Sequence, residues 1–146
     1  LNDYTLNISS IVLKNVIKVG NYFFKTGSWE LGATSTDYTL YSGSATPLGS
    51  TGYIPMDGGT PSYLFLIPQT LTAWNHSGNP ANTYIELNCS INKSGFSYSG
   101  KAYIPFGATG ATLEAGKKYD VKINIGKNSL YKVVDNNASL IIPQNS

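Results

Sequence analysis

The side chains that most often carry out catalysis are scarce in this sequence. Its 146 residues include one histidine, His76, and one cysteine, Cys89. His76 lies in the turn-rich stretch Trp74-Asn75-His76-Ser77-Gly78-Asn79-Pro80, and the sequence has no Gly-x-Ser-x-Gly nucleophile motif to accompany it. A Ser-His-Asp triad would have to use this one histidine. An ordinary exposed loop histidine is the simpler interpretation.

Cys89 lies in a segment in which apolar and polar residues alternate. Ile85, Leu87, Cys89 and Ile91 share one face if the segment is a β-strand. A cysteine on an apolar face is usually a small buried hydrophobe, and burial raises the thiol pKa and weakens it as a nucleophile. Zinc would need further ligands, but the sequence has neither Cys-x-x-Cys nor His-x-His spacing. We therefore predict a core position for Cys89.

The eight carboxylates are dispersed along the chain. A glycosidase needs two carboxyl groups about 5–10 Å apart, and no pairing of this kind is indicated by the spacing. Asp57-Gly58-Gly59 and Asp135-Asn136-Asn137 offer oxygen ligands of the kind that calcium prefers, but neither follows the spacing of an EF-hand loop, and turn formation explains both. We predict no catalytic residue, no metal, no cofactor and no enzymatic activity.

Charge argues against nucleic acid as a partner. Charged residues make up 12% of the chain, about half of the usual share, and the formal net charge is +2. All ten cationic side chains are scattered lysines. Without arginine the chain cannot make the bidentate guanidinium contact that commonly reads guanine.

The aromatic residues suggest one binding chemistry. The chain has 11 tyrosines and two tryptophans, Trp29 and Trp74. Exposed rings can stack on sugars, so both tryptophans are candidate glycan contacts. Packing in a core or in a protein interface is the alternative for the same residues.

Hydrophobic periodicity predicts strands throughout. Apolar residues recur at every second position between Gly and Pro residues, as in half-buried strands. A change of phase at Ser9-Ser10 predicts a β-bulge, because Ile8 and Ile11 cannot otherwise share a face. About seven to nine short strands indicate an all-β sandwich. The strands that can be placed are Tyr4–Ile8 with its continuation Ile8–Val19, Tyr63–Ile67, Tyr84–Ile91, Lys101–Pro105, Tyr119–Ile125 and Ala138–Ile142.

Several stretches, in order, resemble the fimbrillin family of Bacteroidales, in particular the C-terminal-type domain of the major and minor fimbrial subunits and their Mfa-like relatives. The segment with Pro68-Gln69-Thr70-Leu71 is the most specific of them. The stretches are Ile11–Val16, Gly20-Asn21-Tyr22, Thr26-Gly27-Ser28-Trp29, Tyr63–Leu71, Tyr84–Leu87, Lys101–Pro105 and Leu113–Tyr119.

The resemblance implies a transthyretin-like, Greek-key sandwich over residues 1–146, which can be the second domain of a two-domain protein. It also implies an exported protein of the bacterial cell surface, with a structural role in the stalk, tip or anchor of a fimbria. Its partners would be other fimbrial subunits, joined by strand exchange. The alternative function is a carbohydrate-binding adhesin module that recognises host or bacterial surface glycans or proteins.

The C-terminal tail is the candidate donor strand. Strand addition needs an exposed sheet edge and a peptide that presents apolar side chains at alternate positions. Leu140 and Ile142 share a face of the tail, and Ala138 and Ile141 complete the candidate set. The alternative is that residues 138–142 form the last strand of the domain's own sheet.

Overall fold

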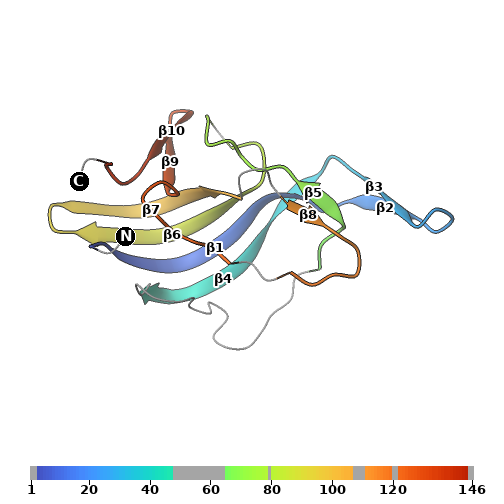
Figure 1. Cartoon of the computed structure of the whole chain (residues 1–146), viewed down its shortest axis with the longest axis horizontal. Helices are drawn as coiled ribbons and strands as arrows, with labels where there is room; N and C mark the ends of the chain where they lie inside the picture. Colours follow the sequence, from blue (N-terminus) through green and yellow to red (C-terminus); the bar gives the residue numbers. More distant parts are fainter. Residues whose placement is uncertain (1–2, 48–64, 79, 107–110, 120–121, 145–146) are drawn as a thin grey trace.

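The computed structural model of this chain describes residues 3–47, 65–78, 80–106, 111–119 and 122–144. These residues form an all-β fold, which confirms the predicted fold class (Figure 1). They contain ten strands: β1 (Thr5–Ile17), β2 (Gly20–Phe23), β3 (Ser28–Leu31), β4 (Ser35–Pro47), β5 (Gln69–Leu71), β6 (Tyr84–Lys93), β7 (Phe96–Pro105), β8 (Ala111–Leu113), β9 (Tyr131–Val134) and β10 (Asn137–Leu140).

Six of these strands form one antiparallel sheet. Its order is β10-β9-β7-β6-β1-β4, so the first strand of the chain lies between β6 and β4. The β2–β3 pair projects beyond one end of this sheet, and the short β5–β8 pair lies near the base of that projection (Figure 1).

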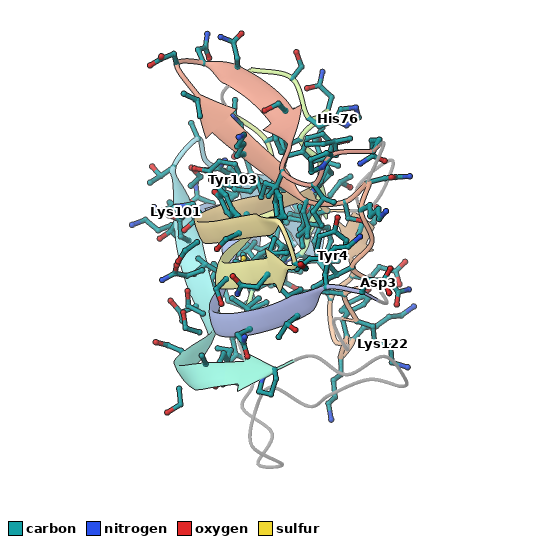
Figure 2. All side chains as sticks on the ribbon, turned by 90° about the vertical axis from the view of Figure 1, so that its left-hand side faces the viewer. Asp3, Tyr4, His76, Lys101, Tyr103 and Lys122 are labelled. Atoms are coloured by element: carbon teal, nitrogen blue, oxygen red, sulfur yellow. The ribbon has the colours of Figure 1, made fainter. Side chains whose placement is uncertain are left out.

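The core lies against one face of the six-stranded sheet. Leu6 and Ile8 of β1 and the predicted face Ile85, Leu87, Cys89 and Ile91 of β6 are all buried. Figure 2 shows Tyr4 on this inner side and Lys101 on the opposite, polar side. The inner face is covered by β5, β8 and chain without regular structure. The buried or partly buried residues of this cover include Leu66, Leu71, Leu113, Ile123, Ile125, Leu130, Ile141 and Ile142.

Two predicted strands are wrong in their described parts. Phe65–Ile67 and the described residues of Tyr119–Ile125 lie outside any strand. Ile123 and Ile125 nevertheless pack against the core. Alternation of apolar and polar residues indicates which side chains are covered, and an extended segment can show it without hydrogen bonds to a neighbouring strand. Tyr63, Leu64 and the turn Asp57-Gly58-Gly59 lie outside the described residues.

The predicted bulge is confirmed, and two further shifts of register follow it. The pairing of β1 with both neighbours shifts between Ile8 and Ser10. Its pairing with β4 shifts again between Ile11 and Val12 and between Leu13 and Val16, and in the last of these Asn15 has a left-handed backbone with φ of 63°. Asparagine tolerates this conformation better than most residues. The side-chain amide of Asn15 donates to the backbone oxygen of Asn82 at 2.9 Å, so this irregularity is tied to the chain that leads into β6.

Gln69 joins the covering layer to the end of β1. Its side chain is buried, and its amide group pairs with the backbone of Ile17 in both directions. Nε2 donates to the Ile17 oxygen at 2.9 Å, and Oε1 accepts from the Ile17 amide at 3.0 Å. Nε2 also donates to the Ile67 oxygen at 3.0 Å. The glutamine of the Pro-Gln-Thr-Leu stretch therefore satisfies backbone groups that would otherwise be buried without partners.

Replacing Gln69 with Met is expected to destabilise the fold. Methionine keeps the length of the side chain but leaves the polar backbone groups of Ile17 unpaired, which costs about 1–3 kcal/mol. Chemical denaturation should measure this loss of unfolding free energy. The control Thr70→Val, at the exposed neighbouring position, should change it by less than about 0.5 kcal/mol. Equal effects of the two changes would contradict this role of Gln69.

Candidate functional site

The predicted donor residues lie in a C-terminal β-hairpin. β10 pairs with β9, and Ala138 lies opposite Val133. The two connecting residues, Asp135 and Asn136, have φ of 49° and 65°, which is the backbone of a tight two-residue hairpin turn. In this structure, residues 138–140 are therefore paired within their own chain, as the alternative interpretation of the tail predicts.

The residues after β10 belong to the core. Ile141 is 4% exposed and Ile142 is fully buried. The Ile141 amide donates to the Leu130 oxygen at 2.9 Å, which extends the hairpin by one bond. Of the four predicted residues, Ile141 and Ile142 are thus the two that anchor the tail, while Ala138 and Leu140 are half-buried.

This hairpin has a narrow connection to the other four strands of the six-stranded sheet. Among the described residues, Tyr103 of β7 and Tyr131 of β9 are the one pair that joins it to β7. The Tyr131 ring stacks on His76 with 5.1 Å between ring centroids and an interplanar angle of 17°. Its edge meets Trp74 at 5.8 Å. Tyr131 therefore holds the hairpin at one point, through ring contacts and one backbone bridge.

Tyr84 and Tyr103 complete this aromatic cluster. They contact Trp74 at 5.8 Å and 6.1 Å between centroids. No sequence pattern indicates this cluster, because its members come from four separate segments and show no common period. The sequence signals only the hairpin that carries Tyr131, because Asp135-Asn136 is a residue pair typical of tight hairpin turns.

His76 and Trp74 differ in solvent exposure. His76 is exposed in a turn, as predicted, and Figure 2 places it beside the β9–β10 hairpin. Trp74 is 3% exposed, and its indole nitrogen donates to the Ser77 oxygen at 3.1 Å. Trp74 is therefore packed in the interior, which is the alternative to glycan stacking for this residue.

Trp29, the other candidate glycan contact, is exposed. It lies on β3 of the projecting hairpin with 39% of its surface exposed, and Tyr22 of β2 lies beside it at 5.3 Å between ring centroids. Phe23 and Phe24 of the same hairpin are also exposed. The structure therefore does not bring the two tryptophans together: one lies in a packed cluster and the other on an apolar surface.

A row of alternating charges crosses the polar face of the sheet. It runs from Asp37 of β4 through Lys14 of β1 and Glu86 of β6 to Lys101 of β7. The Lys14 ammonium lies 2.8 Å from Asp37 and 3.8 Å from Glu86, and Lys101 lies 3.7 Å from Glu86. Four neighbouring strands are thus linked on the face opposite the core.

The environment of Asp37 shifts its ionisation. Burial alone would raise the pKa of this carboxyl, but hydrogen bonds from Lys14 and from the Asn15 amide outweigh burial and hold the pKa below its ordinary value. The same Asp37 contact raises the pKa of Lys14 despite its partial burial. Both groups are therefore charged over a wide range of pH.

The outer edge of β4 pairs with no other described strand. β4 is 13 residues long and pairs with β1 on one side. Long edges with unpaired backbone groups are templates for another chain. β4 contains no lysine, the residue most often used to block such an edge.

The groups considered for catalysis remain apart. Cys89 is buried, and burial raises the pKa of its thiol to about 11. In the parts of the chain that the structure describes, no three His, Cys, Asp or Glu residues are grouped so that they could hold a metal ion. The same parts contain no helix with the length and apolar character needed to cross a membrane.

Comparison with known proteins gives one match. A family model described as fimbrillin-like matches residues 1–139, which includes all of the sheet strands from β1 to β9 and most of β10. Neither curated proteins nor solved structures give a significant match.

Replacing Tyr131 with Ala is expected to loosen the C-terminal hairpin. The change removes the ring contacts with His76 and Trp74, so the amides of β9 and β10 should exchange with deuterium at least tenfold faster. The amides of β6 should be unaffected. The matched variant Tyr131→Phe keeps the ring and should behave like the parent. Uniform acceleration across the whole sheet would instead indicate global destabilisation.

Replacing Asp37 with Asn is expected to make the protein less stable in a pH-dependent way. A carboxyl whose pKa is lowered by folding contributes stability above its ordinary pKa of 3.8, and this stability is lost as the pH falls through the folded-state value. The difference between parent and variant should therefore be largest near neutral pH and disappear in strong acid. Denaturation curves from pH 2 to 7 measure it, with Asp135→Asn in the exposed hairpin turn as the control. A constant difference at all pH values would contradict the prediction.

Proposed function

The chain belongs to the fimbrillin-like family, and we propose that it is a non-catalytic structural subunit that assembles by exchanging its C-terminal strand. The family supports the general role, a structural component of surface fimbriae with other fimbrial subunits as partners. Strand exchange is the further step, and the contacts of residues 138–142 support it.

The first argument is that Ile141 and Ile142 fill an apolar pocket in the core of their own domain. Ile141 and Ile142 are buried, and each fully buried isoleucine contributes about 1.5–3 kcal/mol. A second copy of the chain offers the same pocket. If the segment moves from its own pocket to that of a neighbour, it exchanges one set of contacts for an identical set. Exchange of identical elements is a low-cost route to assembly for this reason.

The second argument is the limited attachment of the hairpin that carries the segment. Within the described chain, one residue pair joins β9 to β7, whereas ten pairs join β6 to β7. β10 has β9 as its one described neighbour, so residues 138–142 can separate from β9 without disturbing the pairing of β1, β6 and β7. An acceptor sheet would therefore keep its core strands in register when its own tail is displaced.

The same proposal has consequences for the whole protein. We infer export to the cell surface, because fimbriae are extracellular. We also infer that residues 1–146 act as one sandwich domain, which can be preceded by another in a longer protein. A Greek-key, transthyretin-like arrangement is part of this inference.

Carbohydrate binding is the second candidate function. The exposed ring of Trp29 supports it, since an exposed indole offers an apolar face to a ligand. The burial of Trp74 gives no support to a role for that ring.

A reversible crosslink between β9 and β10 tests strand exchange. Val133 and Ala138 are direct partners across antiparallel strands, where Cα atoms lie about 4.5–5.5 Å apart, within the range that a disulfide spans. The variant Val133→Cys/Ala138→Cys should stay monomeric when oxidised and recover polymer formation after reduction. Size-exclusion chromatography and electron microscopy would measure this.

The single variant Val133→Cys is the control and should assemble under both conditions. The native thiol of Cys89 does not interfere, because it is buried and its pKa is raised. Polymers that form equally well with the crosslink in place would rule out donation of residues 138–142. The structural role in fimbriae would then need another mode of assembly.

A further inference from the structure

An open hollow lies beside the projecting β2–β3 hairpin. It has a volume of about 500 Å³ and is lined by Trp29 of β3, by residues from 65 to 68 and by residues 114–118. Two aromatic rings take part: Trp29 is 39% exposed and Phe65 is 93% exposed. Two exposed rings that line one hollow with polar groups at its edge are a feature of ligand-binding grooves, so the hollow is a candidate binding site.

The indole ring of Trp29 is held in place from behind. Tyr22 of β2 lies directly opposite Trp29, and Gly20 lies diagonally from it, so that a Cβ atom added to Gly20 would lie 3.4 Å from the indole carbon Cε3. The ring therefore lies against bare backbone on this side, while Tyr22 contacts it from the same strand. A ring fixed before the ligand arrives loses little conformational entropy on binding.

Polar groups line the same hollow. Glu114 and Lys117 form an ion pair at its edge, and both side chains are more than half exposed. The Glu114 amide donates to the Tyr119 hydroxyl at 2.9 Å, which stabilises the loop that carries the pair. The carboxylate can accept hydrogen bonds and the ammonium can donate them.

This combination selects the chemistry of the ligand. Lys118 also lines the hollow, but a phosphate would meet the carboxylate of Glu114 and a Lys117 that is already paired with it. A purely apolar ligand would bury this ion pair without replacing its contacts with water. A sugar ring has an apolar face of C–H groups and hydroxyls that both donate and accept. It can therefore contact the rings and the ion pair together.

We propose that this hollow binds a saccharide, with Trp29 and Phe65 as the stacking surfaces and Glu114 and Lys117 as hydrogen-bonding partners of its hydroxyls. Its volume falls within the roughly 300–1,000 Å³ of small-ligand sites. Nine described residues line it, whereas a stable protein interface uses about 20–30 residues on each side. The proposal rests on the carbohydrate-binding candidate and is independent of strand exchange.

Binding to a glycan array tests the proposal, with neutral, sialylated and uronic-acid-containing oligosaccharides as the probes. The oxidised Val133→Cys/Ala138→Cys monomer can serve as the protein, so that a failure of strand exchange does not affect the result. A bound oligosaccharide should also shield Trp29 from a fluorescence quencher. Trp74 is already covered and should contribute little to this change.

Two ring variants and one control decide the outcome. Trp29→Ala should weaken binding at least tenfold, Trp29→Phe should recover part of it, and Phe65→Ala should weaken it several-fold. Phe65 is almost fully exposed, so its removal does not endanger the fold. Phe24→Ala is the control, because Phe24 is 90% exposed on the same hairpin but does not line the hollow.

Three results would overturn the proposal. The first is the absence of binding across the whole array. The second is binding that survives both Trp29→Ala and Phe65→Ala. The third is an equal loss in Phe24→Ala, which would show adhesion through the apolar hairpin as a whole and favour a protein partner.

Discussion

A sheet with one apolar face must cover that face, and this requirement organises the whole domain. The inner sides of β1, β6 and β7 carry mainly apolar residues along their length. Their outer sides carry mainly serine, asparagine and charged groups, with Tyr84 and Tyr103 of the aromatic cluster at one end. The described chain meets the requirement with two short strands and extended segments. Each segment of this cover needs its own attachment, such as the paired amide of Gln69 or the isoleucines of the tail.

The same requirement gives the C-terminal tail two properties that are rarely combined. Ile141 and Ile142 are buried in the same core as the apolar residues of the central strands. The hairpin that carries them nevertheless meets the sheet through one described pair and a small group of rings. Strong side-chain burial with few backbone bonds is the arrangement that an exchangeable segment needs.

The sequence predicted the parts of the fold that depend on local pattern. The buried face of β6, the bulge after Ile8 and the core position of Cys89 follow from alternation, which the sheet enforces. Alternation misled at Tyr119–Ile125, because a covering segment also buries alternate residues without joining a ladder. The ring contacts of Tyr131 and the separation of Trp29 from Trp74 could not be predicted, since both depend on how distant segments pack.

The two ends of the described chain differ in how they would bear tension. β1 lies between β4 and β6 and is hydrogen-bonded along both sides, so a pull on its start loads many bonds at once, in shear. β10 lies at the margin of the sheet and pairs with β9 alone, so a pull on its end breaks bonds one after another, as a zipper opens. In a fibre under load, a β10 that stays within its own chain would yield first.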